Sequence, residues 1–332
     1  MRSERNADPA AARQRVVRRE TVVAFGETLI DRFPDRAVLG GAPFNVACHL
    51  AALGADPVLL TRAGKDSAGR RIERAMQARG LDTRGLQRDP VRATGEVLVA
   101  LDGDGPSFDI LPDQAYDHIH PGLARMIGLS THPEIVYCGT LAQRGDSRRA
   151  LRELLHAVQA RVFLDVNLRD PWVDIDALRD SLTRADVVKL NLAELQRVTE
   201  LFGLDGAAPE ARASRLLLGF SLHRVIVTCG AAGAWTLDAA GQLDAIPGGS
   251  VPRWIDSVGA GDGFAAVCIL GMLRNWPVAD SLARADAFAR ALCGMRGAVP
   301  DDAAFYRPFV EAWASRPGSQ SETKQNGAEW KA

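Results

Sequence analysis

The sequence contains few cysteines, and their spacing predicts neither a disulfide framework nor a zinc site. The five cysteines lie far apart, at positions 48, 138, 229, 268 and 293. Most of their neighbours are apolar or small residues, and no two cysteines show the spacing of a metal-binding pair. We therefore expect reduced, buried cysteines in a cytoplasmic protein.

Long hydrophobic runs and an excess of one charge are also missing. The longest apolar stretch, 264–273, is too short to cross a membrane. The formal net charge is −1, so nothing suggests a nucleic-acid or membrane partner. Hydrophobic residues make up 47% of the chain, which is ample for a real core. We expect a folded domain over 21–314, a disordered basic tail over 1–20 and a disordered polar tail over 315–332.

The common nucleotide-binding signatures are absent as well. Gly259 and Gly261 begin like a dinucleotide-binding turn, but Phe264 stands where the third glycine is needed. The only Gly-Lys pair, Gly64-Lys65, is followed by Asp66, which excludes a P-loop there. The sequence has no Gly-x-Ser-x-Gly elbow, and its six histidines do not cluster. These absences argue against a hydrolase, a dehydrogenase and a zinc enzyme.

The most informative segment present is 256–264, Asp-Ser-Val-Gly-Ala-Gly-Asp-Gly-Phe. An acid, a glycine turn and a second acid lead into the apolar run 264–273, which predicts a loop that opens into a buried helix. The free N–H groups of the first turn of such a helix suit an anion. Asp262 would repel a phosphate, but a general base that deprotonates a hydroxyl attacking a phosphoryl group fits its position. The alternative is an ordinary acidic residue at a helix N-terminus.

Strand and helix patterns alternate along most of the chain. The expected strands are 21–25, 57–61, 135–138, 162–166, 187–190 and 225–228, and the expected helices are 44–53, 68–79, 148–160, 176–184, 193–202, 264–273 and 278–295. This rhythm predicts an α/β fold with a mostly parallel central sheet and helices on both faces. The segments near 28–40 and 91–112 do not fit the rhythm, and we expect them to form a small antiparallel β lid. Asp102 to Gly105 signals a hairpin within it.

Polar residues follow four of the predicted strands, at the edge where open α/β sheets bind ligands. They are Glu27 and Asp31; Asp165, Asn167 and Arg169; Lys189, Asn191 and Glu194; and Thr228, Gly230 and Gly233. Asn191 and Glu194, one helical turn apart, could hold a hydrated Mg²⁺, and Arg169 could offset phosphoryl charge. Each also has a plainer interpretation, as a helix cap, a solvated acid or a turn residue. Their common placement favours a shared site.

Taken together and in this order, these segments resemble the ribokinase-like sugar kinases of the PfkB family, over roughly 21–311. The motifs that carry the resemblance are 40–47 with Leu53-Gly54, 165–169, 191–194, 228–230 with Gly233, and 256–262 with Phe264. The resemblance implies an ATP-dependent carbohydrate kinase that uses Mg²⁺.

The resemblance also implies roles for individual residues. Asp262 would be the catalytic base, and the backbone N–H groups of Gly259, Ala260 and Gly261 would form an anion hole. The other implied contacts are Asp31, Gly41 and Asn45 to the sugar; Asn191 and Glu194 to Mg²⁺ and phosphate; Lys189, Thr228, Gly230 and Gly233 to ATP; and Asp256 and the carbonyl of Val258 to a monovalent cation. Because Val258 stands where threonine is common, K⁺ dependence stays open.

The particular residues in these motifs suggest which sugar accepts the phosphoryl group. Gly40 to Pro43, Gly26 to Asp31 and the segment 165–172 are most similar to fructokinases, so we expect phosphorylation of fructose at a primary hydroxyl, position 6. Glu96 and Phe108 on the lid, together with Asn167, are candidate sugar contacts, with exposed or core strand positions as the alternative for the first two. Ribose, 2-keto-3-deoxygluconate, a nucleoside and a non-catalytic sugar-binding paralogue remain open. Relatives pair their lids across a dimer, and exposed strands need cover, so we expect a homodimer.

Overall fold

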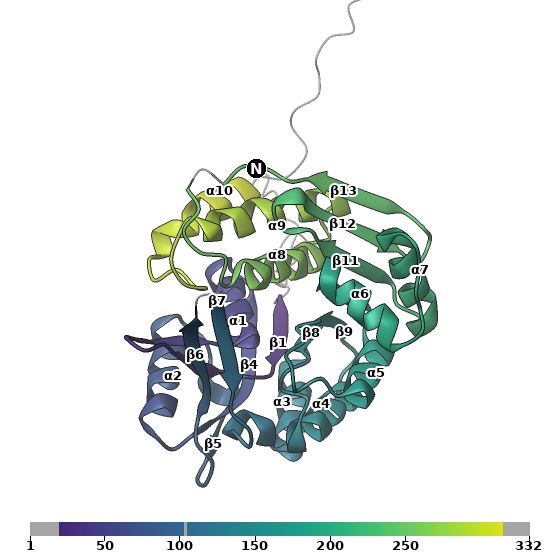
Figure 1. Ribbon diagram of the computed structural model, residues 1–332. Coiled ribbons are helices and arrows are strands. Elements are labelled where there is room, and N and C mark those ends of the chain that lie inside the picture. Colours follow the sequence, from purple (N-terminus) through teal and green to yellow (C-terminus); the bar gives the residue numbers. More distant parts are fainter. Residues whose placement is uncertain (1–19, 103–104, 252, 315–332) are drawn as a thin grey trace, which may run out of the picture.

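The computed structural model describes residues 20–102, 105–251 and 253–314. A nine-stranded sheet runs through it in the order β13-β12-β11-β10-β9-β8-β1-β4-β5 (Figure 1). Its strands are β1 (Thr21–Phe25), β4 (Asp56–Gly64), β5 (Leu86–Asp89), β8 (Ile135–Gly139), β9 (Arg161–Asp165), β10 (Val187–Asn191), β11 (Arg224–Thr228), β12 (Gly233–Asp238) and β13 (Leu243–Pro247). Each strand is parallel to its neighbours along the run β11-β10-β9-β8-β1-β4-β5. β12 is antiparallel to β11, and β13 is antiparallel to β12. The predicted mostly parallel α/β sheet is confirmed.

Helices cover both faces of this sheet (Figure 1). On one face pack α1 (Ala42–Ala52), α2 (Ser67–Ala78), α8 (Ala260–Arg274), α9 (Val278–Cys293) and α10 (Arg307–Ala314). On the other pack α3 (Pro121–Thr131), α4 (Gly145–Ala157), α5 (Ile175–Arg184), α6 (Leu192–Leu201) and α7 (Pro209–Phe220). Val22 and Ala24 of β1 join the first core, and Val23 and Phe25 join the second. This alternation explains why positions 22–25 of the strand are all apolar.

Three helices, α3, α7 and α10, were not predicted. Pro121 and Pro209 open α3 and α7, and a proline at the start of a helix is compatible with it because its missing N–H needs no partner there. The predicted start of α8 at 264 was also wrong. The helix begins at Ala260, so Gly261 and Asp262 belong to its first turn. Short 3₁₀ turns, η2 (Thr83–Gly85), η3 (Ala115–His118), η4 (Gly230–Ala232) and η5 (Ala303–Phe305), complete the chain.

A second, four-stranded sheet forms the lid, in the order β3-β2-β6-β7. Its strands are β2 (Leu29–Arg32), β3 (Ala37–Gly40), β6 (Gly95–Asp102) and β7 (Gly105–Ile110). The predicted hairpin is present, with Val97 opposite Ile110 and Val99 opposite Phe108. The expectation of an entirely antiparallel lid was wrong, because β2 and β6 pair in parallel. Between β2 and β6 the chain contributes β4 and β5 to the main sheet. A connection of this length can bring the chain back in the same direction, so β2 and β6 pair in parallel.

The predicted tails, 1–20 and 315–332, lie outside the described residues except for Glu20. The Glu20 carboxylate accepts hydrogen bonds from Arg274 Nε and Nη2, both at 3.0 Å. All five cysteines are free and four are buried. In the described part of the chain, no helix combines the length and the apolar character that a membrane span requires.

We expect Asp66→Ala to lower the free energy of unfolding by about 1–3 kcal/mol, because it removes both a helix cap and a tie to the lid. Asp66 Oδ1 accepts hydrogen bonds from the Gly69 amide and from Thr94 Oγ1, each at 2.7 Å, and Oδ2 accepts one from the Thr94 amide at 2.8 Å. Thr94 leads into β6, so one carboxylate joins α2 to the lid. Urea denaturation at pH 7 measures the loss.

Asp82→Ala is the matched control for this prediction. Asp82 caps the short turn η2 with one hydrogen bond, from the Arg84 amide at 2.8 Å, so we expect a loss below about 1 kcal/mol. Equal losses in the two variants would contradict the role given to Asp66. Burial alone would raise the pKa of Asp66, but hydrogen bonds from Thr94 and Gly69 lower it. The stability that Asp66 adds is therefore present above pH about 4 and lost as the pH falls below that value.

Candidate active site

A cavity of about 680 Å³ opens at the carboxyl ends of the central strands, with the lid forming part of its wall. The lid contributes Leu29, Asp31, Val97, Phe108 and Ile110; the ends of β9, β10 and β11 contribute Asp165, Asn191 and Thr228; and the start of α8 contributes Gly259, Gly261 and Asp262. Residues far apart in the sequence meet here because parallel strands bring their carboxyl ends to one edge. This is the edge at which the sequence predicted a shared site.

Asp262 lies in the first turn of α8, in the cavity wall. The Asn45 amide group donates a hydrogen bond from Nδ2 to Asp262 Oδ2 at 2.7 Å. Burial raises the pKa of Asp262 to about 6, although the hydrogen bond from Asn45 and the positive charges of Lys189 and Arg169 act in the opposite direction. A carboxylate with a pKa just below neutrality is largely ionised at pH 7 and a stronger base than an exposed aspartate.

The partner of Asp262 is set in place by the Gly-Gly-Ala-Pro segment. Gly41 has φ of 108°, and a Cβ atom there would lie 2.5 Å from the Glu27 carbonyl oxygen. Glycine is therefore required where the chain turns from β3 into α1. Asn45 follows in the first turn of α1, and its side chain is buried. Its Oδ1 atom has no hydrogen-bond partner among the described residues, which leaves an acceptor available to a ligand.

A buried ion pair lies in the same wall. Lys189 Nζ donates to Asp165 Oδ1 at 2.7 Å, and Tyr137 Oη donates to Asp165 Oδ2 at 3.3 Å. Burial works against the charged ammonium group, but Asp165 raises the pKa of Lys189, so the lysine stays protonated. Lys189 was expected on the ATP side, and the structure adds that its charge is already paired with Asp165.

Asn191 and Glu194 form a capping box at the start of α6. Asn191 Oδ1 accepts from the Glu194 amide and Glu194 Oε2 accepts from the Asn191 amide, both at 2.9 Å. The helix-cap interpretation is therefore correct for this pair, yet both residues also line the cavity. Burial raises the pKa of Glu194, and the nearby charge of Asp165 adds to the effect.

These residues fit a hydrated Mg²⁺. The cap uses one oxygen of Glu194 and leaves the other, and a bound cation would relieve the cost of burying this carboxylate. Mg²⁺ keeps several of its water ligands and needs only one or two protein carboxylates beside substrate phosphates. Within residues 20–102, 105–251 and 253–314, no group of three or more His, Cys, Asp and Glu side chains is arranged to hold a metal directly.

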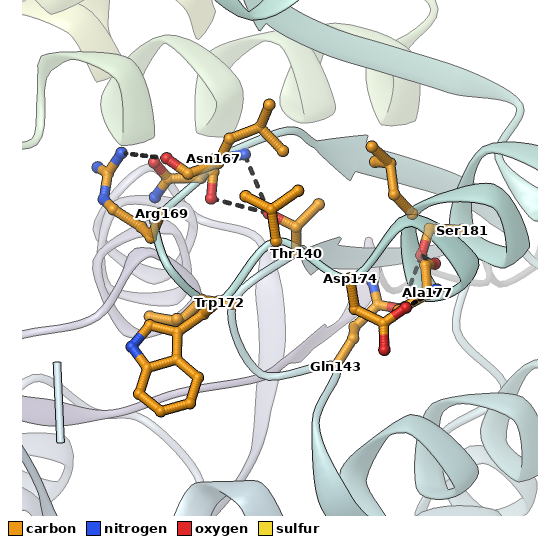
Figure 2. Close-up of a pocket in the computed structure, with 12 residues that line it drawn as sticks. Thr140, Gln143, Asn167, Arg169, Trp172, Asp174, Ala177 and Ser181 are labelled. Carbon is orange, nitrogen blue, oxygen red and sulfur yellow. Dashed lines mark hydrogen bonds between the residues drawn. The ribbon is translucent and has the colours of Figure 1, made fainter. Parts of the chain in front are cut away.

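The loop after β9 brings Asn167 and Arg169 to the cavity. Figure 2 shows Thr140 beside Asn167, whose carbonyl oxygen accepts from Thr140 Oγ1 at 2.8 Å. Arg169 Nη1 donates to the Leu168 carbonyl oxygen at 3.1 Å, and in the described part of the chain it forms no ion pair. Further along the loop, Trp172 Nε1 donates to the Ile110 carbonyl oxygen of the lid at 3.1 Å. The loop thus joins the lid to the main domain and leaves the Arg169 guanidinium group available to a substrate.

Among the predicted site residues, Glu96 and Ala260 do not line the cavity. Side chains alternate along β6, so Val97 faces the cavity while Glu96 pairs with Arg32 on the outside of the lid. The Ala260 amide donates to the Ser257 carbonyl oxygen at 3.2 Å. This leaves Gly259 and Gly261 as the glycine-turn residues of the wall that precede Asp262.

Asp256, Gly230 and Gly233 also lie outside the wall, whereas Val258 is part of it. The Asp256 carboxylate accepts from the Val258 amide at 3.1 Å and from the Gly297 amide at 3.3 Å, so it fastens the glycine turn to the segment near residue 297. Gly230 and Gly233 flank η4, just beyond Thr228.

Two acidic residues of the cavity wall, Glu27 and Asp165, were expected at this edge of the sheet but were given no individual role. The available signal was their position, since each stands at the carboxyl end of a predicted strand, β1 and β9. Sequence alone did not reveal that both carboxyl groups would be buried beside Asp262.

Comparison with known proteins identifies the family. Residues 19–303 match the family described as pfkB family carbohydrate kinase. The chain belongs to this family. A fructokinase from Klebsiella pneumoniae is 30% identical over 285 residues, covering 78% of this chain and 86% of that protein. A fructokinase from Vibrio alginolyticus is 28% identical over 275 residues, covering 77% of this chain and 87% of that protein.

Solved structures of pfkB relatives share the fold. The fructokinase of Xylella fastidiosa with bound ATP superposes with a TM-score of 0.75 at 22% identity, covering 90% of this chain and 100% of that chain. The fructokinase of Vibrio cholerae, solved with fructose, ADP and a potassium ion, has a TM-score of 0.73 at 24% identity, covering 87% of this chain and 97% of that chain. The ribokinase-like fold predicted from the motifs is confirmed.

Proposed function

We propose that this carbohydrate kinase transfers the γ-phosphoryl group of ATP to fructose and forms fructose 6-phosphate. One observation carries the proposal, namely the Asn45–Asp262 pair at 2.7 Å in the wall of a cavity of about 680 Å³. Asp262 is a half-buried carboxylate at the N-terminus of a helix, where a phosphoryl group would be stabilised. Asp31 and Phe108 of the lid lie on the same cavity and complete the sugar side.

In this mechanism Asp262 accepts the proton of the C6 hydroxyl as its oxygen attacks the γ-phosphorus. The bond between that phosphorus and the bridging β–γ oxygen breaks, and ADP leaves with the bond's electrons. The amides of Gly259 and Gly261 and the N-terminus of α8 stabilise charge on the migrating group, and Arg169 offsets further charge. Mg²⁺ bound through water at Asn191 and Glu194 would neutralise phosphate charge.

The charges around the cavity favour a neutral acceptor. The charged wall residues are the acids Glu27, Asp31, Asp165, Glu194 and Asp262 and the bases Arg169 and Lys189. A sugar acid such as 2-keto-3-deoxygluconate would bring another negative charge to this wall, whereas the hydroxyl groups of fructose can donate to its oxygens. The fructokinases among the relatives support the same choice.

Further parts of the proposal concern ATP and a monovalent cation. We place ATP against Lys189, Thr228 and the turn that holds Gly230 and Gly233. We place K⁺ near Asp256 and the Val258 carbonyl. The Vibrio cholerae fructokinase with a bound potassium ion motivates the second placement.

We also propose a cytoplasmic homodimer. Leu98 is an exposed apolar residue on the face of the lid that points away from the cavity, 40% accessible, and a paired lid would cover it. The unpaired cysteines suit a reducing compartment. Light scattering that finds a monomer at micromolar concentration would contradict the dimer.

A coupled ADP-release assay tests the acceptor. The panel is fructose, ribose, 2-keto-3-deoxygluconate, adenosine and aminoimidazole riboside, each with Mg²⁺ and with either K⁺ or Na⁺. We expect fructose to give a kcat/KM at least about tenfold above the others, and ³¹P NMR to find the phosphate on C6. A higher kcat/KM for another acceptor would replace fructose, and no ADP release with any of them would count against the enzymatic function.

A further inference from the structure

Glu27 is the most unusual buried group in the cavity wall. It follows Gly26 at the end of β1 and is only 2% exposed. Burial raises the pKa of its carboxyl group, and the backbone amides of Glu27 itself and of Ala42, the first residue of α1, act in the opposite direction. Its Oε2 atom is buried and has no hydrogen-bond partner among the described residues. Glu27 therefore brings into the cavity wall a carboxyl group whose Oε2 atom lacks a partner in the described part of the chain.

An unpaired buried oxygen is costly and calls for a partner. Asn45 Oδ1, in the same wall, is also buried and unpaired within the described residues. The second polar atom of Asn45, Nδ2, is occupied by Asp262. Two unpaired polar atoms beside the proposed base form the kind of surface that a ligand with several hydroxyl groups can satisfy.

The protonation of Glu27 depends on charges from several elements. The groups that act on it or that it acts on are Asp262 of α8, Arg169 of the loop after β9, Tyr116 of η3, and Tyr137 and Cys138 of β8. Burial raises the pKa of Glu27 to about 7, and Asp262 adds to the effect while Arg169 opposes it. Asp262, stabilised by Asn45, has a pKa of about 6. When two nearby carboxyl groups compete for one proton, it stays on the group with the higher pKa.

We propose that Glu27 is a further sugar-binding residue, whose protonated carboxyl group donates a hydrogen bond to an oxygen atom of the acceptor sugar. This inference rests on the proposed sugar kinase function and deepens it. Below pH about 7 Glu27 is mostly neutral, so that Asp262 carries the negative charge needed to take a proton. Glu27 thus acts as a hydrogen-bond donor and Asp262 acts as the base.

Glu27→Ala and Glu27→Gln test this role. The alanine variant loses the donor, and we expect its KM for the sugar to rise roughly tenfold or more, with the KM for ATP changed less than about threefold. The glutamine side chain keeps the shape and offers an N–H donor in place of the O–H group. It should recover most of the loss at pH 6. If both variants lose sugar affinity equally, Glu27 does not act as a donor and the proposal fails.

The pH profile separates sugar binding from a merely structural role. In the wild type, kcat/KM should rise through pH about 6, where Asp262 loses its proton, and fall above pH about 7, where Glu27 loses its own. Glu27→Gln cannot lose that proton, so its profile should stay level above pH 7. Asp286→Asn removes another carboxyl group whose pKa burial raises, on α9 and outside the cavity wall, and should keep the alkaline fall. An alkaline fall that survives in Glu27→Gln would overturn the proposal.

Deoxy analogues of the sugar identify the direct contact. One analogue, which lacks the oxygen that Glu27 reaches, should lower kcat/KM in the wild type but not in Glu27→Ala. An equal penalty for all analogues in both proteins would mean that Glu27 does not contact the sugar. Failure of this proposal remains distinct from failure of the kinase function, because the latter would appear as wild-type protein that phosphorylates no sugar.

Discussion

Asp262→Asn should lower kcat by roughly a hundredfold to ten-thousandfold and leave the KM for ATP within about threefold of its wild-type value. The asparagine side chain has the same shape, and its oxygen can still accept the hydrogen bond that Asn45 Nδ2 donates at 2.7 Å. The structure around it therefore has no reason to rearrange. What the amide cannot do is take a proton from the sugar hydroxyl, so the loss falls on the chemical step.

Asp280→Asn provides the matched control for Asp262→Asn. Asp280 is the acidic residue in the first turn of α9, as Asp262 is in the first turn of α8, but it does not line the cavity. We expect its kcat to stay within about twofold of the wild type, because an acid at a helix N-terminus contributes mainly a small dipole interaction. If the two variants have the same kcat, Asp262 is an ordinary helix-terminal acid and the base must be sought elsewhere.

The sequence predicted the residues whose positions follow from local turns. Gly41 and Asn45 lie at one helix start, and Gly259, Gly261 and Asp262 lie at another, and glycines at such turns can be recognised without knowing the rest of the fold. The strand rhythm also located the edge where these two starts meet, because parallel strands end together. The part of the site that depends on helix N-termini was therefore largely readable from the chain.

The sequence did not predict the register, that is, which residues of neighbouring strands lie opposite one another. Lys189 and Asp165 are direct partners across β10 and β9, and their 2.7 Å ion pair follows from that alignment alone. Glu96 was predicted on the correct strand but toward the wrong face, because a shift of one residue reverses every side chain. The parallel pairing of β2 with β6 likewise depends on where a distant part of the chain returns, which no local pattern encodes.

Gly259→Ala is expected to reduce kcat by about a hundredfold or more, through the geometry of the anion hole. Gly259 caps α8 with φ of 78°, and a Cβ atom there would lie 2.4 Å from both Cα and Cβ of Ala298. Alanine in this conformation costs about 1–2 kcal/mol before any clash is counted. The clash then forces the glycine turn away from Ala298, and losing one anion-hole donor typically lowers kcat by about 10²–10³-fold.

Gly203→Ala is the control for Gly259→Ala, because it introduces backbone strain without displacing the glycine turn before α8. Gly203 also has a positive φ, 65°, but a Cβ atom there would meet nothing within 4 Å, so this variant should lose about 1 kcal/mol of stability with kcat unchanged. Steady-state kinetics and thermal melting of both variants distinguish the two effects, and an unchanged kcat in folded Gly259→Ala would remove this turn from the mechanism. Because Asp262 lies in the first turn of α8, directly after its N-cap Gly259, the displaced turn also carries Asp262 with it. The double variant Gly259→Ala, Asp262→Asn should therefore lose less than the product of the two single losses, since both act on one phosphoryl transfer step.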